Sequence, residues 1–314
     1  MIHLAIIGAG RFGSRYLETI EQMHGVIVKY VCVTTPGKHK DLNKRYVVLD
    51  DYKKLFAYKD VDGVIIATPA STHAQIAFDF IEKKWPILIE KPMTTSLSDA
   101  LHLYTCWKKR KGIVFVGHIH LYNPAFIAMS NLLSKIGDVE RIDGVAGNWG
   151  PIRVDTTLLW DWAIHEISMV NYLLNKTPIT VQAFVDNLPA YNYVTIKMKY
   201  KGKLTTVITN SWSFSEKVRK MTIVGKKGIV SFDDISDKKL IFHERSGTTL
   251  KKTTYPTYLD KKPLQNELEN FITCIKKNIQ PTSNIAFALN TIKVLDAAER
   301  SLLEEGKVVK ISHV

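Results

Sequence analysis

The stretch that decides the fold is Ile2–Gly13, which reads IHLAIIGAGRFG. A short apolar run ends in the glycine spacing GxGxxG, and a helical pattern begins directly behind it. In such a turn Gly8 permits the tight bend, Gly10 lets the backbone approach a pyrophosphate, and Gly13 lets the helix pack close to the strand. Free N–H groups at the start of the helix attract phosphates. The stretch therefore predicts a dinucleotide site; a glycine turn without a ligand is the alternative.

The end of the second predicted strand bears on the choice of dinucleotide. A chain that binds NAD normally places Asp or Glu about 20 residues beyond the glycines, where it holds the ribose 2′-hydroxyl. Thr34 occupies that position here, and Lys38 follows it. Thr34 carries no charge that would repel the 2′-phosphate of NADP, and Lys38 can form an ion pair with that phosphate. We therefore favour NADP over NAD. The alternative is that residues 38–40 form a solvated loop.

Strand-like and helix-like runs alternate through the first 120 residues. The strand-like runs are residues 3–8, 26–33, 61–68, 86–90 and 113–116, and the helical runs are 12–24, 72–84 and 96–111. Ser96 is the expected N-cap of the last helix, with Asp99 three residues beyond it. Continuous apolar strands between helices predict a parallel sheet covered on both faces, hence a doubly wound α/β Rossmann domain over residues 1–120.

The pattern changes after residue 120. Helical runs at 124–135 and 158–174 precede short alternating segments between 180 and 243, and helical runs return at 264–277 and 285–305. This alternation predicts a large, open, mostly antiparallel sheet. We therefore expect a second, α+β domain over residues 121–314 for substrate binding and oligomerisation, with a C-terminal helix able to pack back on the first domain.

Composition and charge limit the class of protein. Of 314 residues, 46% are hydrophobic, and no apolar run approaches the roughly 20 residues that span a bilayer. Three cysteines without a CxxC argue against a disulfide framework or thiolate zinc site, and fit a reducing cytoplasm. The chain opens on a predicted strand rather than a signal peptide. The net charge of +13 is spread over many lysines without any nucleic-acid-binding pattern, so we expect neither nucleic acid nor membrane as a partner.

Three further segments carry a resemblance to a known family. They are Ala67–His73 (ATPASTH), Glu90–Pro92 (EKP) and Asp161–His165 (DWAIH). With the glycine turn, in this order and spacing, they resemble the glucose–fructose oxidoreductase / inositol dehydrogenase / MocA (Gfo/Idh/MocA) family over the whole chain. The resemblance implies an NAD(P)-dependent oxidoreductase that assembles as a homodimer or homotetramer through the sheet of its second domain.

The resemblance also implies roles for single residues. The lysine of EKP, here Lys91, would reach the substrate hydroxyl and the nicotinamide ribose, and the peptide before its proline is often cis. Asp161 and His165 would supply the acid/base, so the expected catalytic residues are Lys91, Asp161 and His165. The expected cofactor-binding residues are Gly8, Gly10, Arg11, Phe12, Gly13, Thr34, Lys38, Thr68, Pro69, His73, Glu90 and Lys91.

Elementary chemistry agrees with these catalytic roles. Asp161 and His165 stand four residues apart and so share one face of a helix. A histidine titrates near neutrality and can take the alcohol proton as hydride leaves, while a neighbouring carboxylate orients its ring. Lys91 can stabilise a developing alkoxide. An Asp–His pair at this spacing more often only stabilises its helix. The other motifs favour a catalytic role for this pair instead.

Residues around these motifs bear on the substrate. Ser168 stands where the family often has a second Asp, Ala163 replaces a glycine, and Trp162 is bulky. The expected substrate-binding residues are Lys91, Tyr122, Asn123, Arg153, Asp161 and His165; a surface position for Arg153 is equally compatible with the sequence.

A pair of histidines, His118 and His120, stands at the end of the first domain. Two residues apart on the last predicted strand, their side chains should share one face. No further ligands stand near them, so we predict no metal and favour a structural or cleft-lining role.

Together these features predict an enzyme that transfers a hydride between NAD(P) and a secondary alcohol or ketone of a sugar, cyclitol or sugar nucleotide. A reductase of a non-sugar carbonyl and a non-catalytic NAD(P)-binding sensor are the alternatives.

Overall fold

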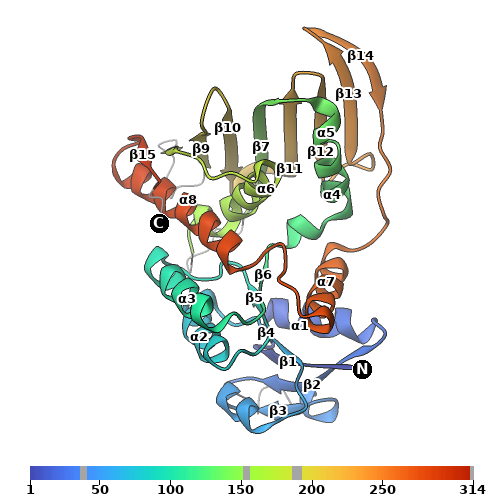
Figure 1. Cartoon of the computed structure of the whole chain (residues 1–314), viewed down its shortest axis with the longest axis vertical. Helices are drawn as coiled ribbons and strands as arrows, with labels where there is room; N and C mark the ends of the chain where they lie inside the picture. Colours follow the sequence, from blue (N-terminus) through green and yellow to red (C-terminus); the bar gives the residue numbers. More distant parts are fainter. Residues whose placement is uncertain (36–40, 151–155, 186–192, 312–314) are drawn as a thin grey trace. The chain divides into compact units, whose positions relative to one another are not determined.

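The computed structural model describes residues 1–35, 41–150, 156–185 and 193–311. The chain forms two compact units (Figure 1). The first contains Met1–Ile119 and Lys262–Leu289, and the second contains His120–Lys261 and Asn290–Val314. The first unit is therefore built from two stretches of sequence that the second unit separates.

The first unit contains a six-stranded parallel sheet in the order β3-β2-β1-β4-β5-β6. Its strands are β1 (Ile2–Ile7), β2 (Val26–Cys32), β3 (Val47–Leu49), β4 (Gly63–Ile66), β5 (Ile87–Glu90) and β6 (Val114–Gly117). Every residue of β4, β5 and β6 is buried, as expected of strands covered on both faces. The predicted doubly wound sheet is confirmed, and its strand order reverses between β1 and β4, where such folds bind ligands.

Helices of the first unit pack in pairs. They are α1 (Arg11–Glu21), α2 (His73–Glu82), α3 (Leu97–Arg110) and α7 (Pro263–Lys277), with 3₁₀ turns at Leu42–Lys44, Tyr52–Ala57 and Ala70–Thr72. Ser96 caps α3 as predicted, because its Oγ accepts a hydrogen bond from Asp99 N at 3.1 Å. Figure 1 shows α7 beside α1 although more than 240 residues separate them in sequence. A late helix thus completes the core of the N-terminal sheet.

The second unit contains a nine-stranded sheet in the order β14-β13-β12-β11-β7-β10-β9-β8-β15. Its strands are β7 (Val139–Trp149), β8 (Thr180–Val185), β9 (Tyr193–Lys199), β10 (Thr205–Ser211), β11 (Ser213–Gly225), β12 (Gly228–Asp233), β13 (Leu240–Ser246), β14 (Thr249–Thr254) and β15 (Val309–Lys310). All pairs are antiparallel except β7 with β10, so the predicted mostly antiparallel sheet is confirmed.

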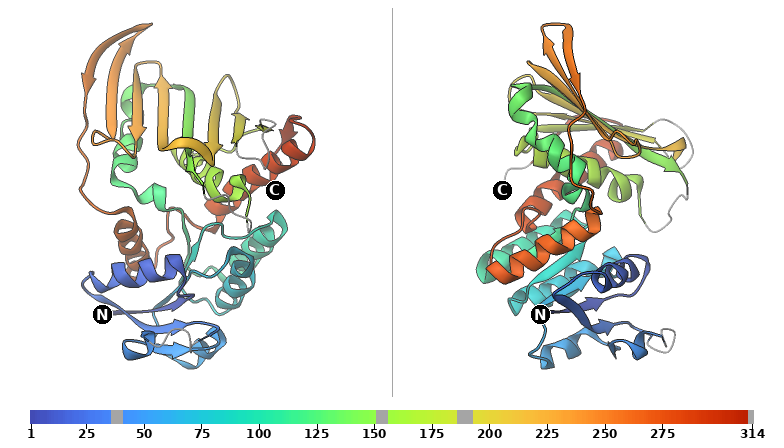
Figure 2. Two further views of the ribbon diagram at one scale, coloured as in Figure 1. Left: turned by 180° about the vertical axis from the view of Figure 1, so that it is seen from behind. Right: turned by 90° about the vertical axis from the view of Figure 1, so that its right-hand side faces the viewer.

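Helices cover one face of this sheet and leave the other open (Figure 2). They are α4 (Pro124–Asn131), α5 (Leu133–Ile136), α6 (Ile164–Leu174) and α8 (Ile285–Leu303), with a 3₁₀ turn at Ile119–Tyr122. Alternate residues of β9, namely Val194, Ile196 and Met198, are buried. No helix in the described ranges is long and apolar enough to cross a membrane.

One local prediction is wrong, and a second is met with a local irregularity. Strand β6 ends at Gly117, and His120 lies in the following 3₁₀ turn, so His118 and His120 do not share a strand face. The predicted helix 158–174 also begins irregularly, because Leu159–Ala163 forms a π-helical turn before α6. A π turn follows i→i+5 bonding, so the spacing of Asp161 and His165 is not that of a regular helix.

Candidate active site

The glycine turn joins β1 to α1 in the geometry that its spacing predicts. Gly8 has a φ of +93°, and a Cβ there would lie 2.7 Å from Ala67 O. At Gly13 a Cβ would lie 1.9 Å from Gly8 O, so only glycine lets the helix approach the strand this closely. Gly10 differs, because nothing lies within 4 Å of its Cβ position. No side chain caps α1 at Gly10, and the open space there suits the phosphates of a dinucleotide.

His73 links two loops at the carboxyl edge of the sheet. Its buried ring places Nδ1 2.8 Å from Pro92 O and Nε2 2.9 Å from Thr68 O. Burial lowers the pKa of His73, and its contacts with the two carbonyls oppose that shift. Pro92 follows the cis Lys91-Pro92 peptide. The side chain of His73 thus connects the Thr68 segment to the EKP segment by contacting a main-chain carbonyl in each.

Glu90 ends β5 with a buried carboxyl beside Lys91. Its Oε2 accepts a hydrogen bond from Lys91 N at 3.1 Å, and its Oε1 accepts one from Tyr16 Oη at 2.7 Å. His118 is also buried in this unit, with its ring 5.6 Å from that of Phe287. Burial, and then the charge of Lys91, lower the pKa of His118 to about 3. The imidazole of His118 is therefore neutral.

In the second unit, His165 and His120 meet edge to face. Their ring centroids are 4.6 Å apart, with an interplanar angle of 85°, and both side chains are buried. Asp161 lies in the π turn before α6, where its N donates to Thr157 O at 2.9 Å. Single π turns inside helices are frequent at functional sites.

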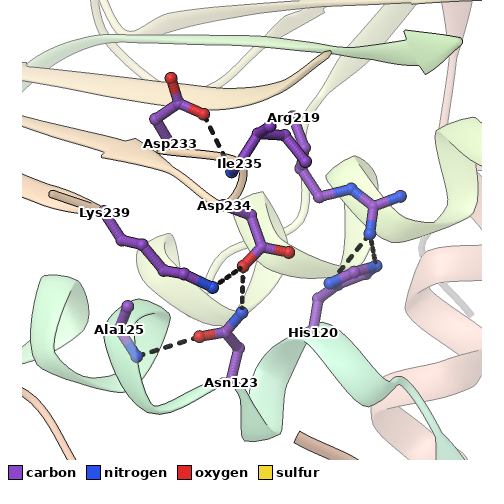
Figure 3. A network of polar contacts seen from close by, with 8 residues as sticks. All are labelled: His120, Asn123, Ala125, Arg219, Asp233, Asp234, Ile235 and Lys239. Atoms are coloured by element: carbon purple, nitrogen blue, oxygen red, sulfur yellow. Dashed lines mark hydrogen bonds and ion pairs between the residues drawn. The ribbon is translucent and has the colours of Figure 1, made fainter. Parts of the chain in front are cut away.

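Arg219 of β11 completes the cluster around these histidines. Its Nη1 lies 2.5 Å from His120 Nε2. Figure 3 shows the guanidinium facing the imidazole ring. Because a guanidinium only donates, this contact makes His120 Nε2 the acceptor. The same guanidinium lies 5.1 Å from the ring centroid of Trp162. Among the described residues, no carboxylate forms an ion pair with Arg219. The cluster therefore brings positive charge close to His165.

Neighbouring polar groups are held by contacts of their own (Figure 3). Asn123 Oδ1 accepts from Ala125 N at 3.0 Å, which caps α4, and its Nδ2 donates to Asp234 Oδ1 at 2.8 Å. Lys239 Nζ lies 3.0 Å from the same carboxylate oxygen. Tyr122 is buried. The side chain of Asn123 is thus held in place by Ala125 and Asp234.

The residues predicted for the site divide between the two units. Within the first unit, the glycine turn, Thr68, His73, Glu90 and Lys91 follow the ends of β1, β4 and β5. Within the second lie Tyr122, Asn123, Asp161 and His165. Lys38 and Arg153 fall outside the described residues. In the described ranges, no group of three or more His, Cys, Asp or Glu could hold a metal ion.

Sequence reasoning missed Arg219 and left His120 without a partner. Arg219 stands in a run of alternating strand residues, and no motif marks it. Its partners His120 and Trp162 are 99 and 57 residues away in sequence, so only the pairing of β11 in the sheet reveals the cluster.

Comparisons with known proteins agree with the fold and the motifs. Profiles described as "Oxidoreductase family, NAD-binding Rossmann fold" and "Oxidoreductase family, C-terminal alpha/beta domain" match residues 2–118 and 142–311. Inositol 2-dehydrogenase of Rhizobium meliloti (strain 1021) is 23% identical, with 98% of each chain covered. The 4-carboxy-2-hydroxymuconate-6-semialdehyde dehydrogenase of Sphingobium sp. (strain SYK-6) is also 23% identical, covering 97% of this chain and 100% of that protein.

Among solved structures, a levoglucosan dehydrogenase in complex with NADH and levoglucosan shares the fold. Its TM-score is 0.87 at 16% identity, covering 99% of this chain and 100% of that one. The two family profiles together span most of the sequence, in the order that the four motifs predict. The protein therefore belongs to the Gfo/Idh/MocA family of oxidoreductases.

Proposed function

We propose that the protein is a dehydrogenase that transfers a hydride between NAD(P) and a secondary alcohol or ketone of a sugar or cyclitol. The observation that carries this proposal is the glycine turn at the β1/β4 switch point, with open space beside Gly10 and tight packing at Gly13. Inositol 2-dehydrogenase, a full-length relative, supports a cyclitol or sugar substrate. The nicotinamide, when bound, supplies the hydride chemistry.

The protein's own part in the reaction is proton transfer and charge stabilisation. His165 takes the hydroxyl proton during oxidation and returns it during reduction, and Asp161 orients the imidazole. Lys91 stabilises the oxygen as negative charge develops. Within the cofactor-binding domain, the glycine turn and the Thr68 and Glu90 segments hold the dinucleotide, and the second domain supplies the substrate pocket.

A test of these roles compares single substitutions with matched surface controls. His165→Asn and Lys91→Met should each lower kcat/KM by about 10²–10⁴-fold, while NAD(P)H affinity in His165→Asn stays within threefold of wild type. The controls are His243→Asn on β13 and the exposed Lys53→Met, and both should keep wild-type turnover. Turnover by His165→Asn within threefold of wild type would refute its assignment as acid/base.

The cluster around Arg219 favours a substrate with an anionic group. Arg219 and His120 place positive charge and a hydrogen-bonding ring beside His165, and the excess of basic residues agrees with an acidic ligand. The relative from Sphingobium acts on a carboxylated semialdehyde by its name, which supports the same class and keeps a non-sugar carbonyl as the second candidate.

This substrate class is tested with paired acidic and neutral sugars. Arg219→Met should raise KM for a sugar acid or sugar nucleotide at least tenfold, whereas Arg300→Met, on the surface of α8, should not. Equal kcat/KM for neutral and acidic substrates in the wild type would contradict an anionic substrate.

For the cofactor, we propose a preference for NADP. Strand β2 ends at Cys32, and the exposed Thr34 just beyond it stands where a chain that binds NAD normally has a carboxylate. Fluorescence titration should show tighter binding of NADPH than NADH, and Thr34→Asp should reverse that order. Tighter NADH binding by the wild type would reject the preference.

A further inference from the structure

Three ionisable side chains from three separate elements meet inside the first unit, next to Lys91. Tyr16 comes from α1, Glu90 from the end of β5, and Glu267 from α7. Tyr16 and Glu267 are 0% exposed and Glu90 is 7% exposed. Tyr16 Oη lies 2.7 Å from Glu90 Oε1 and 3.0 Å from Glu267 Oε1.

Counting protons constrains this cluster. A phenol carries one proton, and an ionised carboxylate can only accept hydrogen bonds. Tyr16 therefore cannot donate to both carboxylates, and a second proton is needed for the second contact. Two negative charges that share one buried phenol would also repel each other at low dielectric. One of the two carboxyls is therefore protonated, and the cluster carries a single negative charge.

Several observations identify the protonated group as Glu267. The shorter contact of Tyr16 is the one to Glu90, as expected of a hydrogen bond to an ionised oxygen. Glu90 Oε2 also accepts from Lys91 N, whereas Glu267 Oε2 has no hydrogen-bond partner among the described residues. Burial and the charge of Glu90 raise the pKa of Glu267 well above its usual value.

The groups around Glu90 point the same way. Burial raises the pKa of Glu90, but Tyr16, Lys91 and the charge of Arg15 oppose that shift. Glu267 has no such opposing cation and is opposed only by its hydrogen bond with Tyr16. Burial and the two carboxyls raise the pKa of Tyr16, so the phenol stays protonated.

We propose that a buried relay runs from a protonated Glu267 through Tyr16 to an ionised Glu90, and that it fixes one negative charge beside Lys91. Glu267 donates to Tyr16 Oη, Tyr16 donates to Glu90 Oε1, and Glu90 Oε2 accepts from Lys91 N. Tyr16 and Glu267 are positioning residues that act through Glu90. Because Tyr16 belongs to the helix opened by the glycine turn, the relay joins the cofactor-binding helix to the Lys91 segment. The effect on turnover rests on the proposed function; the protonation state does not.

The relay makes an asymmetric prediction for two chemically identical substitutions. Glutamine at position 267 still donates to Tyr16, so Glu267→Gln should keep kcat and cofactor affinity within threefold of wild type. Glutamine at position 90 lacks the negative charge. Glu90→Gln should therefore lose kcat at least tenfold, and the pH dependence of kcat should differ from that of the wild type. Glu18→Gln, exposed on the same helix as Tyr16, is the control. A tolerated Glu90→Gln with an impaired Glu267→Gln would overturn the assignment.

A stability measurement tests the protonation state without substrate or cofactor. Above the unfolded pKa of about 4.3, native Glu267 retains a proton that the unfolded chain has lost, so wild-type stability falls as pH rises towards the folded pKa. Glu267→Gln lacks this effect. In urea titrations, its folding equilibrium constant relative to wild type should rise tenfold per pH unit in that range. The ratio for Glu18→Gln should stay flat, and that for Glu90→Gln should rise less steeply, because removing the charge of Glu90 lowers the pKa of Glu267 only in part. A steeper rise for Glu90→Gln than for Glu267→Gln, or a rise for neither variant, would overturn the relay whatever the enzyme's substrate.

Discussion

At the scale of single residues, His118 shows how burial determines the protonation state of a side chain. Its side chain is 1% exposed, and neither ring nitrogen has a hydrogen-bond partner among the described residues. Burial and Lys91 lower its pKa to about 3, so the ring is neutral at pH 7. A buried polar group without a partner costs about 1–3 kcal/mol. His118 therefore reduces the stability of the first unit.

Replacing His118 with phenylalanine should stabilise the protein, more strongly in acid. Below the unfolded pKa of about 6.5, the unfolded chain binds a proton that native His118 does not, so wild-type stability falls with falling pH at about 1.4 kcal/mol per pH unit. Urea titrations should give His118→Phe a gain of about 1–2 kcal/mol at pH 7.5 and about 2 kcal/mol more at pH 5.0. His243→Phe, half-buried on β13, is the control. An equal gain at both pH values would contradict a neutral native His118.

At the scale of elements, regular patterns were predictable and short irregular turns were not. The capping pair Ser96 and Asp99 locates α3 to within one residue, because both partners of the cap are local in sequence. Strand β3 has three residues and no alternation to detect. The π turn before α6 and the 3₁₀ turn holding His120 depend on tertiary packing, which no local pattern records. The motifs thus marked the candidate site, while its geometry required the structure.

Two substitutions in the glycine turn test different things: Gly13→Ala tests packing, and Gly10→Ala tests contact with the ligand. Gly13→Ala places a methyl 1.9 Å from Gly8 O and should cost at least about 3 kcal/mol of stability, since only backbone movement relieves the clash. Gly10→Ala meets nothing within 4 Å at a φ of −75°, so its stability should stay within about 1 kcal/mol of wild type. Its NAD(P)H affinity should nevertheless fall at least tenfold. Unchanged affinity in a folded Gly10→Ala would place the phosphates elsewhere.

At the scale of the whole molecule, alternation along the sequence predicted both sheets, and a C-terminal helix able to pack back on the first domain was expected, but no pattern showed which residues α7 would meet. Helix α7 carries apolar residues at helical spacing, and these fit a surface on either unit equally well. Phe271 instead packs 5.7 Å from the ring of Phe115, and Ile275 Cδ1 lies 2.7 Å from the Cβ position of Gly63. Gly63 leaves room for this contact, and a single sequence does not show that the two positions meet.

We propose that one face of the nine-stranded sheet mediates assembly into a homodimer or homotetramer. Thr195, Val207, Thr209 and Thr222 are half-buried and alternate along their strands with buried residues. Light scattering should give a mass of two or four chains, and Val207→Glu with Thr209→Glu should dissociate the assembly without loss of secondary structure. A wild-type monomer at micromolar concentration would exclude this assembly.

The contact between Tyr16 and Glu267 also has a consequence for biosynthesis. These residues are 251 positions apart, and His120–Lys261 of the second unit is made between them. At roughly 5–20 residues per second, a ribosome needs on the order of tens of seconds to add α7 after α1. During that interval the nascent sheet lacks the helix that covers Gly63 and holds the proton beside Glu90. The N-terminal domain therefore cannot finish folding until most of the second unit has been made, and chaperones have an opportunity to bind in that window.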